Sequence, residues 1–365
     1  MNILALDFSP TPKKSSLTSL LLSSLVEGMK QSGAAVEVIK VNQEGTTVKA
    51  CSGCFHCWTI TPNKCSTIKD YMSENLFKKW KSSDLVVYAT PIYNKFMTAS
   101  MKSFLERLQP AGDLGHLRGN SNLNYPDTVM VSTATYHGRD EFSFLSEYMN
   151  NYYSVEKNSK IVAELYRPQI KLLASGLFPK FNKIITQAYF EAGKEIIDKG
   201  YVTDETIAAI SHNITDLEKF NKILLLINRS IKKHNMTHKV FIKKKPPLDV
   251  TNVDEFILLS EILLSYANLP SDLQEFTIVM NFDEGPCSIS FGKEELVIQH
   301  GEIENYNLKI TTDLQTWMRL MSPYGVISEE IKNKKLNITA ANNKDHEFFG
   351  ELISALMPTQ NKASA

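Results

Sequence analysis

Residues 85–89 read LVVYA and run directly into TPIYN at 90–94. Five consecutive apolar residues are typical of a parallel strand whose two faces are both covered by helices. A second run of this kind, TVMVS at 128–132, leads into TATYHG at 133–138. These two runs favour an α/β fold built on a central parallel sheet.

The residues before this strand predict the same architecture. Residues 2–8, NILALDF, form an apolar run that ends at the loop SPTPKKSS. Apolar residues then recur at helical spacing from 17 to 29, and Gly33 ends that helix. Residues 35–41, AVEVIKV, alternate and are β-branched, which predicts a second strand.

The residues after this strand continue the alternation of helices and strands. We predict a fifth strand at 160–165 and helices at 72–81, 99–108, around Phe142 to Tyr148, at 181–199 and at 203–214. Five strands interleaved with helices predict a doubly wound, five-stranded parallel sheet. Ligands bind such sheets outside the carboxyl ends of the strands, which here carry the loops 9–18, 90–96 and 133–138.

The pattern changes after about residue 217. A helix at 217–233 leads into the segment 234–250, whose Pro246-Pro247 favours a linker. An amphipathic helix at 253–267 precedes four close-set strands that read as a meander. The strands are predicted at 276–282, 287–291, 296–299 and 307–311, with helices near Trp317 and Phe348 after them. This order is typical of an α+β domain.

Composition narrows the classes of function. The chain of 365 residues carries 40 basic and 40 acidic side chains, so its formal net charge is zero. A neutral balance predicts no nucleic-acid partner, and no apolar run approaches the length of a membrane span. The first residues lack the basic and apolar regions of a secretory signal, so we expect a cytoplasmic protein.

Four of the five cysteines fall within fifteen residues, spaced C-x2-C-x2-C-x7-C: Cys51, Cys54, Cys57 and Cys65. Disulfides rarely persist in the cytosol, so this run indicates metal binding or redox chemistry. Three cysteines at this spacing are typical of [4Fe–4S] ligation, with Cys65 as the fourth thiolate. Packing, redox-active thiols without a cluster, and a zinc site stay open as alternatives.

The first loop is rich in hydroxyls and lies at the mouth of a helix. A helix amino end with such side chains suits a phosphate monoester, although serine and threonine there also serve simply as helix caps. The loop lacks G-x-G-x-x-G and G-x-x-x-x-G-K, which excludes a dinucleotide fingerprint and a P-loop. Its hydroxyl residues are Ser9, Thr11, Ser15, Ser16 and Thr18.

Several motifs in order resemble one family over about residues 1–215. They are SPTPKKSSLT, CSGCFHCW with TPNKC, TPIYNKFMTASMKSFLER and AYFEAGKEIIDKGYVTDETI. They are similar to the flavodoxin-like NAD(P)H-dependent FMN reductases and, within them, the iron–sulfur flavoproteins. Thr11 departs from the arginine that the family often carries there, which weakens the inferred phosphate contact.

The resemblance implies FMN as cofactor, NAD(P)H as electron donor and a homo-oligomer. It implies that one group of residues holds the FMN phosphate: Ser9, Ser15, Ser16 and Thr18. A second group would line the isoalloxazine ring: Pro91, Ile92, Tyr93, Asn94 and Phe96. Residues from Thr133 to Gly138 would form a third wall, and no catalytic side chain is assigned.

Residues from about 255 to 360 resemble a sterol-carrier-protein-like domain, in which a sheet and helices enclose an apolar tunnel. The alternative is that its apolar residues are simply the core of a small domain. The candidates are Phe276, Ile278, Met280, Ile289, Phe291, Trp317, Met318 and Met321.

The sequence therefore predicts three segments: a flavodoxin-like FMN domain at 1–215, a helical linker at 216–252 and a sterol-carrier-like domain at 253–365. The expected function is an FMN-dependent NAD(P)H oxidoreductase that reduces a quinone-like or other small acceptor and carries a domain for a lipophilic ligand. The alternative is an iron–sulfur flavoprotein that acts as an electron carrier or redox sensor.

Overall fold

The computed structural model describes residues 1–12, 16–112, 125–154, 159–174, 179–266, 275–292, 295–342 and 345. The chain divides into two compact units, Met1–Lys171 with Asn182–Asn213 and Leu172–Phe181 with Ile214–Ala365. The boundaries expected from the sequence, at 215 and 252, stay a prediction.

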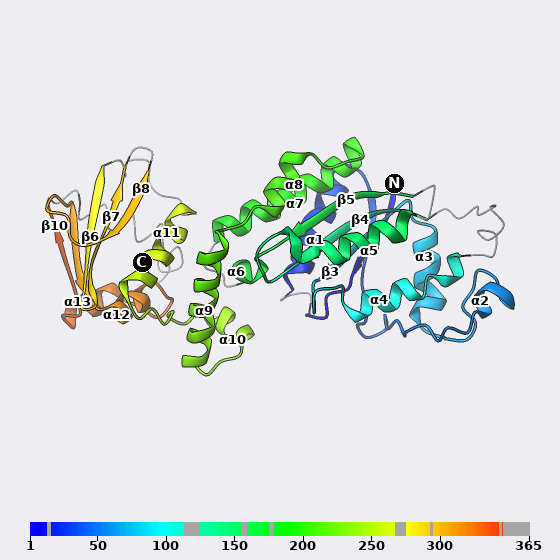
Figure 1. The fold of residues 1–365 in the computed structure, drawn as a ribbon, viewed down its shortest axis with the longest axis horizontal. Coiled ribbons are helices and arrows are strands. Elements are labelled where there is room, and N and C mark those ends of the chain that lie inside the picture. The colour runs from blue at the N-terminus through cyan, green and yellow to red at the C-terminus, as the bar shows by residue number, and fades with distance from the viewer. Residues whose placement is uncertain are drawn as a thin grey trace. The chain divides into compact units, whose positions relative to one another are not determined.

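Five parallel strands form the sheet of the first unit, in the order β2-β1-β3-β4-β5 (Figure 1). The predicted doubly wound, flavodoxin-like sheet is confirmed. Its chain order reverses between β1 and β3, which places the ligand-binding edge at the carboxyl ends of these strands. The strands are β1 (Asn2–Asp7), β2 (Ala35–Lys40), β3 (Leu85–Pro91), β4 (Asp127–Thr133) and β5 (Ile161–Arg167).

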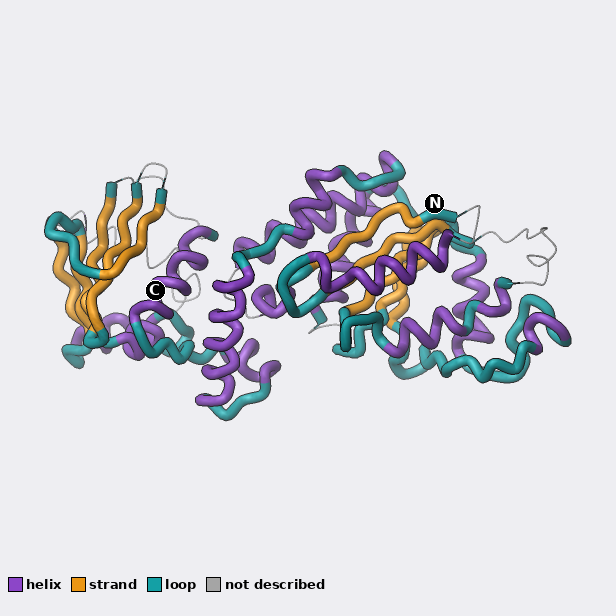
Figure 2. Tube along the Cα trace, in the orientation of Figure 1, coloured by secondary structure: helices purple, strands orange, loops and turns teal. Residues whose placement is uncertain are grey.

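Helices cover both faces of this sheet, as Figure 2 shows. On one face α1 contacts β1, β3 and β4, and Tyr189 of α7 donates its hydroxyl to the carbonyl of Leu165 in β5 at 3.1 Å. The other face packs against α3, α4 and α5. The helices of this part of the chain are α1 (Leu17–Gln31), α2 (His56–Thr59), α3 (Phe77–Lys81), α4 (Ala99–Glu106), α5 (Ser143–Ser154), α6 (Ile170–Ala174), α7 (Pro179–Lys199) and α8 (Asp204–Ser211).

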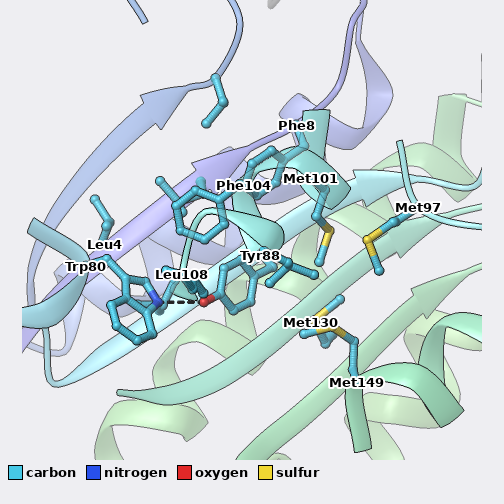
Figure 3. Close-up of a cluster of buried hydrophobic side chains, with 14 of the residues drawn as sticks. Leu4, Phe8, Trp80, Tyr88, Met97, Met101, Phe104, Leu108, Met130 and Met149 are labelled. Carbon is cyan, nitrogen blue, oxygen red and sulfur yellow. Dashed lines mark hydrogen bonds between the residues drawn. The ribbon is translucent and has the colours of Figure 1, made fainter. Parts of the chain in front are cut away.

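Aromatic side chains fill the core between the sheet and α3, α4 and α5. Figure 3 shows Trp80 and Tyr88 side by side, with the indole Nε1–H donating to the Tyr88 hydroxyl at 2.7 Å. The hydroxyl of Tyr153 donates to the same oxygen at 3.1 Å. Burial raises the pKa of Tyr88 well above its ordinary value, so this hydroxyl stays neutral in the core.

Two glycines let α1 and α7 cross closely. A Cβ at Gly28 would lie 1.9 Å from the carbonyl oxygen of Phe190, and one at Gly193 would lie 2.1 Å from that of Leu25. Both obstacles are backbone atoms, which cannot rotate away. The approach of these two helices therefore requires glycine at both positions.

Local structure differs from the sequence expectation in three places. The cysteine run, expected as a loop, contains the short helix α2. The predicted helix 72–81 begins with a π-helical turn, η2 (Met72–Leu76), before α3. The predicted linker 234–250 contains α10 (His238–Lys244), whose first turn is capped by Thr237. All three are single turns or little more, too short for periodicity to reveal them.

The second unit holds a mixed sheet in the order β10-β9-β6-β7-β8. The expected meander holds only for β6, β7 and β8, because β9 crosses back and pairs in parallel with β6. The predicted helix around Phe348 lies outside the described residues. The strands are β6 (Phe276–Phe282), β7 (Gly285–Phe291), β8 (Leu296–His300), β9 (Leu308–Thr312) and β10 (Leu336–Ala340), and the helices are α9 (Leu217–Lys233), α10, α11 (Val253–Ser265), α12 (Leu314–Leu320) and α13 (Ile327–Lys332).

Charged side chains attach both the segment before α11 and the first turn of α11 to α9. Arg229 pairs with Asp249 at 3.2 Å and with Glu255 at 2.6 Å, and Lys233 pairs with Asp249 at 2.6 Å. This segment is thus an ordered part of the second unit. No helix among the described residues has the length and hydropathy needed to span a membrane.

Candidate functional site

The loop between β1 and α1 brings together three of the predicted phosphate residues. Ser9 and Ser16 are buried, and their hydroxyl oxygens lie 2.7 Å apart. Ser16 is the N-cap of α1 and accepts the backbone N–H of Ser19 at 3.1 Å. Thr18 lies in the first turn of the helix, whereas Ser15 lies outside the described residues.

The buried carboxylate of Asp7, which was not predicted from the sequence, holds this loop in place by accepting hydrogen bonds from it. Asp7, the last residue of β1, accepts the backbone N–H of Ser9 at 2.9 Å and the hydroxyl of Ser19. Lys40, at the end of β2, pairs with the same carboxylate at 2.9 Å. The lysine balances the buried negative charge, so the loop above it remains compatible with an anion. An Asx-type D-F-S sequence after an apolar run is the signal that could have identified Asp7.

The β3–α4 loop turns sharply at two residues with positive φ. Asn94 and Lys95 have φ of 51° and 66°, and Tyr93 and Phe96 exchange two backbone hydrogen bonds across them. Asn is among the few side chains that tolerate this conformation. The turn leaves Tyr93 half exposed at the edge of the sheet, while Pro91 remains buried in β3.

Hydrogen bonds connect the three loops at the carboxyl edge of the sheet. The hydroxyl of Thr18 lies 2.7 Å from that of Thr133, at the end of β4. The backbone N–H of Ile92 donates to the carbonyl of Thr133 at 2.8 Å. The hydroxyl of Thr98, at the start of α4, donates to the carbonyl of Phe8 at 3.1 Å. Residues from all three predicted ligand loops therefore meet at one edge.

Lys95 adds a contact between the second and third loops. Its ammonium lies 2.5 Å from the Glu141 carboxylate and 5.9 Å from the centre of the Tyr136 ring. Gly138, which lies between Tyr136 and Glu141 in the sequence, has a φ of 92°, a backbone conformation that favours glycine.

The edge has the chemical character that FMN requires. The first turn of α1 contains no acidic residue and Lys40 pairs with the nearby Asp7 carboxylate, so the positive amino end of the helix can attract a phosphate. Tyr93 and Tyr136 are 50% and 57% exposed, so their apolar rings are available to a planar ligand. These residues fit a phosphorylated flavin.

The cysteines surround a second site in the segment between β2 and η2. Cys51, Cys54, Cys57 and Cys65 all line one cavity of about 310 Å3, and none of them forms a disulfide. Burial raises the pKa of the Cys57 thiol, and the other three thiols act in the same direction. In contrast, a hydrogen bond from the hydroxyl of Thr67 lowers the pKa of the exposed Cys54.

Four thiols around one cavity are a donor set that a [4Fe–4S] cluster uses. In the part of the chain that the structure describes, no three His, Cys, Asp or Glu side chains converge on one ion position. A [4Fe–4S] cluster has a separate iron for each thiolate, so its four ligands surround a larger volume. Four thiols around one cavity match that requirement.

A buried arginine that sequence reasoning missed closes the base of the cysteine segment. Arg107 follows α4 and is bidentate to Asp70, with nitrogen–oxygen distances of 2.8 and 3.0 Å. Its guanidinium also donates to the carbonyls of Lys49 and Ile68, at 3.0 and 3.4 Å. Arg107 thereby joins the residues before the first cysteine to those after the last one. Only the LER sequence at the end of a predicted helix could have indicated it.

Comparisons with known proteins agree with the motifs of the first unit. Residues 1–141 match the family model described as NADPH-dependent FMN reductase. The iron–sulfur flavoprotein of Archaeoglobus fulgidus is 30% identical over 140 residues, which cover 38% of this chain and 57% of that protein. The resemblance to FMN reductases and iron–sulfur flavoproteins is confirmed for this region.

Two solved structures show more distant similarity. The NAD(P)H:quinone oxidoreductase from Methanothermobacter marburgensis is 14% identical, with a TM-score of 0.41 over 54% of this chain and 96% of that chain. A UbiJ-SCP2 ubiquinone synthesis protein is 8% identical, with a TM-score of 0.20 over 23% of this chain and 73% of that chain. These TM-scores are too low to support an assignment.

Proposed function

We propose that this chain is an FMN-dependent oxidoreductase that takes electrons from NAD(P)H and passes them to a quinone-like or other small acceptor. The observation that carries the proposal is two hydrogen-bonded pairs of hydroxyls at the carboxyl edge of the sheet, Ser9 with Ser16 and Thr18 with Thr133. They lie at the amino end of α1, within the region that matches the reductase family.

The residues of the three loops have separate tasks in this proposal. The amino end of α1 and the hydroxyls of Ser9, Ser16 and Thr18 hold the phosphate, while Asp7 and Lys40 keep the loop in shape. Ile92 and Tyr93 present an apolar wall to the flavin ring. When bound, FMN accepts hydride from a nicotinamide and releases electrons singly or in pairs.

A charge substitution tests the phosphate site without removing the helix cap. Asp and Asn both cap helices well, so Ser16→Asp and Ser16→Asn should each preserve α1. The new carboxylate would repel the phosphate. We expect Ser16→Asp to weaken FMN binding by at least about a hundredfold, and Ser16→Asn, which loses the hydroxyl but adds no charge, to weaken it by about tenfold.

Riboflavin, which lacks the phosphate, is the matched ligand for this titration. Quenching of flavin fluorescence should give the same riboflavin affinity for both variants and the unsubstituted chain. Equal loss of FMN in the Asp and Asn variants would remove the phosphate assignment. If the FMN-loaded chain oxidises neither NADH nor NADPH in the presence of quinones, the oxidoreductase proposal itself fails.

The cysteine cavity supports a second candidate, an iron–sulfur flavoprotein that carries single electrons or senses redox state. Cys51, Cys54, Cys57 and Cys65 would each supply one thiolate. Anaerobic reconstitution with iron and sulfide should then yield four of each per chain. Cys57→Ser should lower that content while FMN binding persists, whereas an unchanged metal content would contradict the ligand set.

The second unit is proposed to bind a lipophilic ligand. Phe276, Ile278 and Met280 of β6 share one sheet face with Ile289 and Phe291 of β7, and all five are buried. The proposed tunnel would lie against this face, whereas a dry core would use the same residues for packing alone. Mass spectrometry of lipid extracted from the purified chain distinguishes the two. A homo-oligomeric state and a cytoplasmic location complete the proposal and are tested by light scattering and cell fractionation.

A further inference from the structure

A larger cavity, of about 600 Å3, lies beside the cysteine site in the first unit. This volume falls within the range of small-molecule pockets in proteins. Its lining comes from residues 63–65 of the cysteine segment, from η2 and α3, and from Arg107 and Pro110, which follow α4. Neither the flavin loops nor the family match assigns it a role.

The π-helical turn gives this cavity its apolar floor. In an α-helix of 3.6 residues per turn, residues five apart lie on different faces. In η2 the backbone N–H of Phe77 bonds to the carbonyl of Met72, five residues earlier, which brings both side chains to the same side. Met72 and Phe77 both line the cavity, with total exposures of 1% and 9%, so Phe77 presents the accessible apolar surface and Met72 packs behind it.

The rim of the cavity is cationic. Lys64, Lys78 and Lys81 line it and are exposed, whereas Glu74 is the single acidic residue among the lining residues that the structure describes. Among the residues that the structure describes, none of these three lysines forms an ion pair. The charge of Arg107 is already neutralised by Asp70. The rim therefore offers uncompensated positive charge to a ligand.

The two cavities share a wall. Cys65, Arg107 and Pro110 line both of them. An occupant of the larger cavity would therefore lie next to one of the four thiols. This location distinguishes the cavity from a chance surface hollow.

We infer that the cavity binds a small aromatic molecule that carries an acidic group, such as a carboxylate or sulfonate. The ring packs on Phe77, which Met72 supports from behind, and the anion faces Lys64, Lys78 and Lys81. The identification of this molecule as the electron acceptor rests on the proposed function, whereas the binding itself does not.

Anthraquinone-2-sulfonate is a suitable probe, because its quinone ring has no open position at which a thiol could add. It is titrated into the full chain in the presence of excess FMN, and binding is followed by equilibrium dialysis. Neutral 2-(hydroxymethyl)anthraquinone is the matched ligand without the charge. We expect the sulfonate to bind about tenfold more tightly, and the difference to shrink as salt screens the lysines.

Two pairs of variants locate the binding. Neutralising all three lysines with glutamine should weaken the sulfonate about tenfold and leave the neutral ligand unchanged, while Lys69→Gln should alter neither. Glu74→Trp should block the cavity for both ligands, whereas Asn75→Trp, on an exposed neighbour outside the lining, should not.

Three results would overturn the inference: equal affinity for the sulfonated and the neutral anthraquinone, an equal loss of binding in both tryptophan variants, or no binding in the presence of excess FMN. Failure of the proposed function looks different. In that case the FMN-loaded chain oxidises no nicotinamide with any acceptor, yet the probe still binds and Glu74→Trp still blocks it.

Discussion

The bidentate pair of Arg107 and Asp70 permits a quantitative prediction about the cysteine segment. Their side chains are only 1% and 4% exposed. Replacing Arg107 with Met removes four hydrogen bonds of the guanidinium, two to Asp70 and two to backbone carbonyls. It also leaves the Asp70 carboxylate buried without its counter-ion.

Removing one partner of a buried ion pair costs about 3–5 kcal/mol, because the other charge stays desolvated. The loss of stability should be confined to one segment, because the guanidinium hydrogen-bonds to the carbonyls of both Lys49 and Ile68. We therefore expect the free energy of local opening around residues 49–70 to fall by about 3 kcal/mol or more in Arg107→Met. Every 1.4 kcal/mol corresponds to a tenfold faster exchange of amide hydrogens that open with the segment.

Hydrogen exchange followed by mass spectrometry measures this effect in the full chain, where global unfolding of two units would not be two-state. The backbone N–H of Lys49, which donates to Asp70 at 2.9 Å, is a direct reporter. Lys102→Met is the matched control, because it breaks an exposed pair with Glu106 on the same helix that is worth only about 0.3–0.5 kcal/mol.

A double-mutant cycle separates the ion pair from other effects of the substitution. Arg107→Met with Asp70→Asn should cost less than the sum of the two single changes, by about 0.5–3 kcal/mol. Unchanged exchange of residues 49–70 in Arg107→Met, or equal acceleration in Lys102→Met, would refute the reasoning.

The same pair sets a pH dependence. Burial raises the pKa of Asp70, but hydrogen bonds from Arg107 and from the backbone N–H groups of Lys49 and Ser73 outweigh burial, so the pKa lies below its ordinary value. A depressed pKa contributes stability that is complete above about pH 4 and is lost as the pH falls through the folded-state value. Protection of the Lys49 amide, corrected for intrinsic exchange, should decline only on that acidic side, and this decline should be absent in Asp70→Asn.

Three further outcomes are expected. Gly28→Ala should lower the free energy of opening of the amides in α1 and β1 by about 1–3 kcal/mol or more in hydrogen exchange, because its methyl group would overlap a backbone carbonyl of α7, whereas Ser23→Ala at an exposed position of α1 should be nearly neutral. Iodoacetamide should modify the metal-free chain faster at Cys54 than at Cys57, since the pKa of Cys54 is lowered and that of Cys57 is raised; peptide mapping that finds the reverse order would contradict these environments. Cys287 should stay unmodified below about pH 9, because burial raises its pKa to about 12, and modification at neutral pH would show that β7 opens.

Long, strongly patterned elements were predicted from the sequence almost to the residue. The strand at 85–89 was found as β3, and the helix predicted at 217–233 is α9 with the same bounds. Both predictions rest on a pattern of apolar residues that extends over several helical turns or over a whole strand. The parallel pairing of β9 with β6 was not predicted, because strand order depends on contacts between distant segments and not on local pattern.

Some parts of the candidate site could likewise be predicted from the sequence, and others could not. The loops around Ser9, Tyr93 and Thr133 could be placed at one edge from sequence, since parallel strands end together. The cysteine spacing likewise indicated one site for four thiols. Asp7 and Arg107 were missed, because the role of a single buried charge depends on its ion-pair partner, and that partner is distant in the sequence.

The sequence by itself determined the alternation of strands and helices, the hydroxyl-rich loop and the spacing of the cysteines, because these are properties of neighbouring residues. Only the tertiary structure decided which residues distant in the sequence contact one another. It placed Arg107 across the two ends of the cysteine segment and opened a cavity against a π-helical turn. Such features arise from close packing and charge pairing across long sequence separations, for which no local pattern of residues exists.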